Sequence, residues 1–323
     1  MSSKARAVWS ELNFLSRDAL YETEKPYSLR FTPTPPSSPI LDKPDASRAA
    51  PLRHNLRTHK VTLEICDARE LASSPKLEVN GFALTRVPTS MAYSDFSDHD
   101  KIEAVYAKEL QQHLKSVFHG ARHVRVIDYV VRRRHPSFPT STGEEYGSQQ
   151  PATLVHLDFS HDEAISMIRT LYGGRAEEIL KSRWQIINTW RPLKGPLKDW
   201  PLAVCDSRSF SLPRDAQTAD VVYPTWAYEN VLVHHHDEQR WFYFSNMEEW
   251  ETMLFACSGS SITPDGKGTI SGSCPHASFH LPQDGTSGPV IPRESVESRA
   301  FIFYGPDECD FPVEVGNVYG ERR

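Results

Sequence analysis

The second half of the chain consists largely of short β-branched and aromatic runs separated by turn residues, and this order constrains the fold most. From residue 184 onward the runs are WQIINTW, PLAVC, ENVLVHH, RWFYFS and SRAFIFYG. Strands of this length joined by polar turns are typical of a β-barrel or jelly roll. We expect a hairpin over 229–245, with HHDEQRW supplying its turn, and one helix over 246–257 capped by Ser245 or Asn246.

Helices are expected before this strand-rich half. The stretch KIEAVYAKELQQHLKSVFHG, residues 101–120, places its apolar residues on one face and ends on a glycine, which predicts an amphipathic helix. We expect a strand over 123–132 and two short helices over 162–174 and 175–184. Helices followed by a run of strands favour the α+β class, and no glycine-rich phosphate loop supports a parallel βαβ fold.

Composition along the chain predicts how it is divided. Residues 25–52 are rich in Pro and Ser and show no helical period, so we expect residues 1–60 to form an extended N-terminal arm. Residues 61–323 would then form one domain. Within that domain, 136–151 and 261–273 are polar and are expected to be surface loops, which often act as active-site lids.

Charge and cysteine content narrow the class of protein. The net charge of −6 argues against a nucleic-acid-binding protein, and the basic run VRRRHP at 131–136 is expected to be the solvated end of a strand. No run approaches the ~18 apolar residues that cross a bilayer, and the N-terminus lacks the apolar segment of a secretory signal. Five cysteines without a CxxC pair fit reduced thiols. We therefore expect a cytoplasmic protein with a small-molecule ligand, and the arm could reach a second copy in a homodimer.

A pair of metal-binding residue types ends one apolar run. In VHLDFS, His156 and Asp158 are two apart, so a strand points both side chains to the same face. Two histidines and one carboxylate form the ligand set of mononuclear non-haem iron(II) oxygenases. A third ligand should come from downstream, and the candidates are His276, His280 and the triplet 234–236. The triplet lies in a predicted turn, which favours solvent exposure, whereas His276 precedes an apolar segment suited to a barrel.

The segment PRESVESRAFIFYG adds a second constraint. Arg293, Ser295, Glu297 and Arg299 alternate, so all four point to one face of a strand whose remainder is core. A buried arginine needs an anionic partner, and its planar fork suits a dicarboxylate. The alternative is a surface ion pair, either Arg299 with Glu297 or Arg293 with Glu294.

A family resemblance extends these inferences. The blocks HLDFSHDEA, NTWRPLKGPLKDWPLAVCD, RWFYFSNM, CPHASFHLP and PRESVESRAFIFY resemble a fungal and bacterial family of iron(II)/2-oxoglutarate-dependent oxygenases. That family includes the cephem 7-methoxylase subunit, the gibberellin desaturase and aziridine-forming enzymes. The resemblance implies a double-stranded β-helix with flanking helices, with iron held by His156, Asp158 and His276. It also implies that Arg293, with Ser295 and Arg299, holds 2-oxoglutarate, and that with O2 the enzyme oxidises an unactivated C–H bond of a specialised-metabolite intermediate.

Further residues have two readings each. Asn188 and Trp190 share a strand face and Arg191 ends that strand, so they line the substrate cavity or form a buried network, with Asp206 and Arg208 as further members. Tyr243 alternates with core aromatics and either faces the cavity or packs in the core. Two other functions stay open at this stage: a zinc-dependent hydrolase with the same three ligands, and a catalytically silent binding subunit of the same fold.

Overall fold

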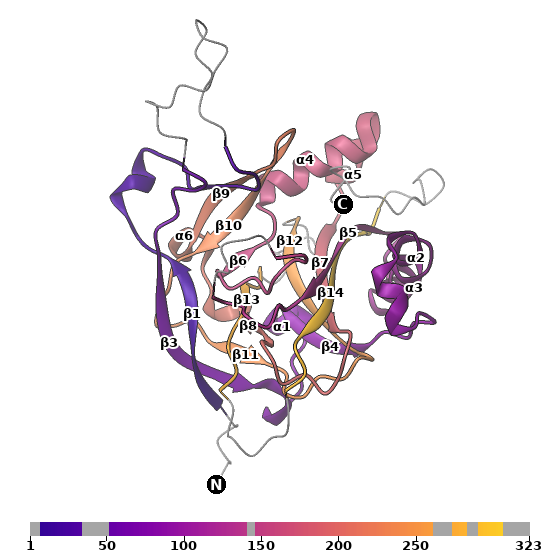
Figure 1. Ribbon diagram of the computed structural model, residues 1–323. Helices are drawn as coiled ribbons and strands as arrows, with labels where there is room; N and C mark the ends of the chain where they lie inside the picture. The colour runs from indigo at the N-terminus through magenta and orange to yellow at the C-terminus, as the bar shows by residue number, and fades with distance from the viewer. Residues whose placement is uncertain (1–6, 34–51, 141–145, 261–272, 283–289, 306–323) are drawn as a thin grey trace, which may run out of the picture.

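Two β-sheets dominate the computed structural model, which describes residues 7–33, 52–140, 146–260, 273–282 and 290–305 (Figure 1). One sheet has nine strands in the order β1-β3-β11-β8-β13-β6-β10-β9-β2, and the other has five in the order β4-β12-β7-β14-β5. The strands are β1 Ala7–Leu15, β2 Tyr27–Leu29, β3 Thr58–Asp67, β4 Phe82–Arg86, β5 His123–Arg133, β6 His156–Leu157, β7 Trp184–Pro192, β8 Leu202–Cys205, β9 Ala216–Val222, β10 Ala227–Val233, β11 Trp241–Tyr243, β12 Glu251–Gly259, β13 His276–Ser278 and β14 Glu294–Phe303.

Strands that follow one another in the chain alternate between the sheets. The chain passes from β6 in the nine-stranded sheet to β7 in the five-stranded sheet and back to β8, and β11 to β14 alternate in the same way. This alternation stacks two sheets around one core, as a jelly roll requires. The predicted α+β class with a double-stranded β-helix core is confirmed.

Helices cover the five-stranded sheet and one end of the molecule (Figure 1). In α3, Leu110 and Leu114 pack with Val126 of β5 and Ile302 of β14 in one hydrophobic cluster. Ile168 of α4 and Ile179 of α5 belong to a second hydrophobic cluster, which also contains residues of β7 and β14. The predicted helix at 101–120 and strand at 123–132 are confirmed. The helices are α1 Leu77–Asn80, α2 His99–Lys101, α3 Ala107–Val117, α4 His161–Tyr172, α5 Ala176–Leu180 and α6 Leu212–Asp215.

The predicted hairpin over 229–245 is wrong. Strand β10 pairs with β6 and β9, whereas β11 pairs with β3 and β8, so three strands of the same sheet lie between them. The alternation of each strand was correctly identified from the sequence. A local turn signal cannot show which strand becomes the neighbour, because that depends on pairings made with distant segments.

The predicted helix over 246–257 is also wrong. Residues 251–259 form β12, which lies between β4 and β7 in the five-stranded sheet. Residues 252–257 are all buried. A run that is buried on both faces has no polar side to show its period, so periodicity does not separate strand from helix there. Tertiary pairing then outweighs helix propensity.

The N-terminal segment contributes to the nine-stranded sheet. Strand β1 pairs antiparallel with β3, and Leu12, Phe14 and Leu15 are buried. The backbone N–H of Val155 donates to the carbonyl oxygen of Asn13 at 2.8 Å, so the chain beside β6 also contacts β1. Residues 34–51 of the expected arm and most of the expected loop at 261–273 lie outside the described residues. The domain division at residue 60 stays a prediction.

The basic run at 131–136 is not the solvated strand end expected from the sequence. Arg132 pairs with Glu297 at 2.8 Å, and Arg133 pairs with Glu294 at 3.0 Å. Both carboxylates belong to β14, which is hydrogen-bonded to β5 along its length. The sequence did not reveal this pairing because the two strands are about 160 residues apart in the chain.

Strand register decides which side chains face the space between the sheets. His276 lies opposite both His156 and Val204, and Phe242 also lies opposite Val204. Directly opposed residues share a face of the sheet, so these four side chains point the same way. That face is lined by a hydrophobic cluster which also contains Trp190 of the five-stranded sheet. Among the described helices, none combines the length and apolar composition needed to span a membrane.

Candidate metal centre

His156, Asp158 and His276 lie together between the two sheets. Ligand atoms of the three side chains all lie within 4.8 Å of one another. Nε2 of His156 is 3.7 Å from Oδ1 of Asp158, and Nε2 of His276 is 3.6 Å from Oδ2. The side chains are 16%, 12% and 7% exposed in chain order, so the group is largely shielded from water. Of the candidate third histidines, the structure brings His276 to the pair.

Hydrogen bonds to backbone carbonyls orient both histidines. Nδ1 of His156 is 2.7 Å from the carbonyl oxygen of Leu154, and Nδ1 of His276 is 3.3 Å from that of Cys274. A carbonyl oxygen only accepts, so Nδ1 carries the proton in each ring. Each Nε2 therefore keeps its lone pair and directs it toward Asp158, which is the usual arrangement of histidine ligands in metal sites.

The protonation states also suit a metal. Burial is the main reason that the pKa of His276 falls to about 4, so this ring is neutral near pH 7. Burial alone would raise the pKa of Asp158, but the Arg299 guanidinium holds it well below its usual value. Nδ2 of Asn188 also donates to Oδ2 of Asp158 at 2.5 Å. A carboxylate and neutral imidazoles are the forms that bind a metal ion.

Behind Asp158, a row of charged side chains crosses the inner face of the five-stranded sheet. Arg299 lies 2.9 Å from Asp128, 3.0 Å from Glu297 and 3.5 Å from Asp158. Glu297 also pairs with Arg132 at 2.8 Å. The charge of Arg299 is therefore matched by three carboxylates. The predicted Arg299–Glu297 pair exists, but with a 5% exposed arginine side chain it is buried rather than a surface pair.

Arg293, at the other end of the same face, has a different environment. It is 1% exposed, and its guanidinium donates to Ser278, to Ser295 at 3.1 Å and to the carbonyl oxygen of Trp200 at 2.8 Å. The ring of Trp190 lies under it, 4.9 Å from the guanidinium carbon to the ring centroid. No carboxylate of the described residues forms an ion pair with this guanidinium. Burial, followed by the charge of Arg132, lowers the pKa of Arg293 to about 9.

Two of the predicted site residues lie elsewhere. Tyr243 is next to Phe242 and so points to the opposite face of the sheet from His276, where its ring packs 5.5 Å from Phe279. Arg191 follows Trp190 on β7, so its side chain points to the opposite face of the sheet, where it donates to the carbonyl oxygens of Val87 and Glu249. The predicted association of Asp206 and Arg208 with this strand does not occur. Asp206 instead binds Arg208, at 2.5 Å, and Asn80.

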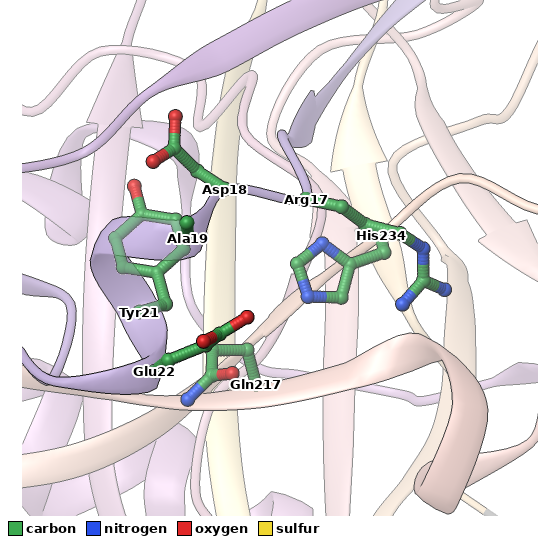
Figure 2. A pocket seen from close by; sticks show the side chains of 7 residues that line it. All are labelled: Arg17, Asp18, Ala19, Tyr21, Glu22, Gln217 and His234. Carbon is green, nitrogen blue, oxygen red and sulfur yellow. The ribbon is translucent and has the colours of Figure 1, made fainter.

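His234 lies outside the centre, in a polar cavity of about 370 Å³ (Figure 2). The expected solvent exposure of the triplet is wrong for this member, which is 6% exposed and has Nδ1 at 2.9 Å from the carbonyl oxygen of Leu15. His156, Asp158 and His276 do not line this cavity. Its walls come from the 17–22 segment, from β9 and from the residue that follows β10: Arg17, Asp18, Ala19, Tyr21, Glu22, Gln217 and His234.

Sequence reasoning missed several charged neighbours of the centre. Arg132 and Asp128 were treated as parts of a strand, yet they complete the network around Arg299 and Glu297. The available signal was alternation, since Asp128 and Arg132 occupy even positions of β5 and so share a face. Their partners on β14 became visible only with the register.

Comparison with known proteins agrees with this geometry. The model of a family described as "Oxidoreductase/YMDC permease-like domain" matches residues 22–303. The hydroxylase/desaturase efuI of Hormonema carpetanum is 30% identical over 265 residues, covering 75% of this chain and 83% of the relative. The Fe(II)/2-oxoglutarate-dependent dioxygenase nvfI of Aspergillus novofumigatus is 28% identical over 307 residues, covering 92% and 96%.

A solved structure supports the fold. The iron and alpha-ketoglutarate-dependent endoperoxidase NvfI superimposes with a TM-score of 0.72 at 24% identity, covering 93% of this chain and 99% of that one. Fold and centre together define an oxidoreductase with a jelly-roll core. The chain belongs to this family of oxidoreductases, and the resemblance to fungal iron(II)/2-oxoglutarate-dependent oxygenases inferred from the sequence is confirmed.

Proposed function

We propose that this protein is an iron(II)/2-oxoglutarate-dependent dioxygenase that oxidises an unactivated C–H bond of a small specialised-metabolite intermediate. His156, Asp158 and His276 would hold the iron. The observation that carries the proposal is the grouping of two correctly oriented imidazoles and one ionised carboxylate, with ligand atoms within 4.8 Å of one another. This donor set fits iron(II), for which a facial triad leaves three positions open.

Arg293 would bind the distal carboxylate of 2-oxoglutarate, assisted by the hydroxyl of Ser295. It is a buried cation without an ion pair among the described carboxylates, and it directly precedes β14, the strand that carries Arg299. A guanidinium fork binds a carboxylate through two parallel hydrogen bonds. Arg299 is already matched by three carboxylates, so its role would be to hold Asp158 rather than the co-substrate.

Charge balance supports joint binding of metal and co-substrate. The buried row contains three cations, Arg132, Arg293 and Arg299, and three anions, Asp128, Asp158 and Glu297, so it is neutral as it stands. An iron(II) ion alone would leave two uncompensated positive charges in a low-dielectric site, which is costly. The 2-oxoglutarate dianion cancels them, so each ligand should strengthen binding of the other.

When bound, iron(II), 2-oxoglutarate and O2 together supply the oxidising power for C–H cleavage, while the protein supplies orientation and exclusion of water. His276 and Asp158 are shielded by the two sheets, and Asn188 and Arg299 fix the carboxylate. Hydroxylation, desaturation and oxidative ring closure would then differ in how the substrate is placed.

A zinc-dependent hydrolase with the same ligands is disfavoured. Such an enzyme has no use for a buried Arg293 without an ion pair, and the relatives efuI and nvfI are named as a hydroxylase/desaturase and a dioxygenase. A silent binding subunit is disfavoured because all three donors have the orientation that metal binding needs. We further propose a cytoplasmic location, since the buried cysteines Cys205, Cys257 and Cys274 are free thiols. The absence of nucleic-acid ligands and the homodimer stay predictions.

The test is an anaerobic titration of the purified protein with iron(II) and then 2-oxoglutarate, followed by visible absorption. We expect a weak charge-transfer band that requires both additions and that disappears in His276→Ala. His234→Ala is the matched control, because this histidine is buried directly after β10 but lies outside the centre. Tight zinc binding without any band would instead support the hydrolase.

A further inference from the structure

Two buried amide oxygens beside the metal centre have no hydrogen-bond partner among the described residues: Oδ1 of Asn188 and Oδ1 of Asn230. Leaving a buried polar atom unpaired is destabilising, so such atoms in a native site call for an explanation. Asn188 is 2% exposed and lies on β7 of the five-stranded sheet, whereas Asn230 is half-buried on β10 of the nine-stranded sheet. The two oxygens therefore come from the two opposed sheets.

The orientation of the Asn188 amide is fixed by its neighbour. Its Nδ2 contacts Oδ2 of Asp158 at 2.5 Å, and an ionised carboxylate only accepts hydrogen bonds. The amide nitrogen must therefore face Asp158, which leaves Oδ1 as an acceptor directly beside the centre. An acceptor in this place requires a donor.

The position of Asn230 follows from the register of β10. Leu232 lies directly opposite His156, so the two side chains share a face of the nine-stranded sheet. Asn230 is two residues before Leu232 and Asp158 is two residues after His156. Because the strands are antiparallel and side chains alternate, Asn230 and Asp158 lie next to each other on this same face.

Neither iron(II) nor 2-oxoglutarate, the two ligands of the proposed function, offers a hydrogen-bond donor to these oxygens. 2-Oxoglutarate at neutral pH is a dianion whose two carboxylates and ketone only accept, and a metal ion itself has no hydrogen to donate. Water can donate to these oxygens, but a bound substrate expels it from the closed site. We infer that the primary substrate carries a hydrogen-bond donor, an O–H or N–H group, which Asn188 and Asn230 accept beside the C–H bond that is oxidised. This inference rests on the proposed function and names the chemical class of its substrate.

The neighbouring surface indicates that the rest of the substrate is apolar. Tyr228 is two residues before Asn230 and shares its face of β10, and its ring lies 5.8 Å from that of Phe159, the residue after Asp158. Rings of Trp226 and Tyr223 extend this aromatic surface at centroid separations of 5.7 and 6.5 Å from Tyr228. The site therefore suits a hydrocarbon ring that bears a hydroxyl or amine group.

The experiment uses matched probes, decahydro-2-naphthol with its O-methyl ether and further fused-ring alcohols with their ethers. The readout is succinate formed from 2-oxoglutarate by the iron-loaded protein. We expect each effective alcohol to stimulate succinate formation about tenfold more than its ether, the effect of roughly one hydrogen bond. In Asn230→Leu this ratio should fall to about one. Equal responses to alcohols and ethers in the unaltered protein, including no response to either, would overturn the inference.

Thermal unfolding separates a binding role from a structural one. Asn230→Leu removes an unpaired oxygen, so its melting temperature should be unchanged or higher. Asn55→Leu is the matched control: Asn55 accepts from the Tyr27 N–H at 2.8 Å and donates to the Lys25 carbonyl at 3.0 Å, so its loss should lower the melting temperature without changing the alcohol-to-ether ratio. An equal decrease in Asn230→Leu would assign Asn230 a structural role and overturn the inference. Failure of the iron and 2-oxoglutarate band would instead overturn the proposed function.

Discussion

Arg299 lies on β14 and Arg293 directly precedes that strand, six residues away; both are at most 4% exposed, yet their surroundings are opposite. Arg299 is matched by Asp128, Glu297 and Asp158, all within 3.5 Å. Arg293 is held by two serine hydroxyls, a carbonyl oxygen and an indole ring, without an ion pair to any described carboxylate. The anionic partners of Arg299 belong to the protein. Arg293 has hydrogen-bond acceptors on the protein but no ion pair with a described carboxylate.

This difference separates two roles that sequence spacing alone leaves together. A buried arginine surrounded by carboxylates is part of the framework, because removing it would leave several buried anions unpaired. A buried arginine with neutral hydrogen-bond acceptors and no anion is prepared for a ligand that brings the anion. Each of the following experiments tests one side of this contrast.

The largest effect should come from Arg299→Leu. This change leaves Asp128, Glu297 and Asp158 without their shared cation, which should lower the free energy of unfolding by about 3–5 kcal/mol. Urea denaturation followed by circular dichroism measures this difference. A loss below about 1 kcal/mol would mean that Arg299 is not the framework residue of the pair.

A smaller effect is expected at the carboxylate that Arg299 supports. Asn188→Ala removes the amide that donates to Asp158, and a hydrogen bond to a charged group contributes about 1.5–3 kcal/mol. We expect a loss in that range by the same denaturation measurement. An unchanged free energy would show that Arg299 alone holds Asp158 in place.

The metal-free protein should lose stability in mild acid because of His276. Its folded pKa is about 4 against 6.5 for the free side chain, so its contribution is complete above pH 6.5 and is lost as pH falls toward 4. Between pH 7 and pH 5.5 this amounts to about 1 kcal/mol. His276→Gln should be less sensitive to pH in that window, and equal sensitivity of both proteins would contradict the assignment.

The smallest effect on stability is expected from Arg293→Leu. Because Arg293 has no ion pair to break, replacing it with an apolar residue removes a desolvation cost together with a few neutral hydrogen bonds. The free energy of unfolding should change by less than about 1 kcal/mol. A loss comparable to that of Arg299→Leu would erase the contrast between the two residues.

The sequence predicted more of the site than of the strand pairing. His156, Asp158 and the face shared by Arg293 and Arg299 followed from alternation and from residue chemistry. The helix at 246–257 and the hairpin at 229–245 were wrong because β12 is buried on both faces and β11 finds its partners in distant segments. Tyr243 and Arg191 could not be placed from the sequence, since alternation shows that two faces exist but not which one meets the metal.

The central claim is that Arg293 is the cation kept for 2-oxoglutarate. Calorimetric titration of 2-oxoglutarate into the Mn(II)-loaded protein, without oxygen, tests it most directly. Loss of a buried, charge-assisted pair should weaken binding about 100-fold in Arg293→Leu, at about 1.4 kcal/mol for each factor of ten. An affinity equal to that of the unaltered protein would contradict the claim and would mean that another residue holds the co-substrate.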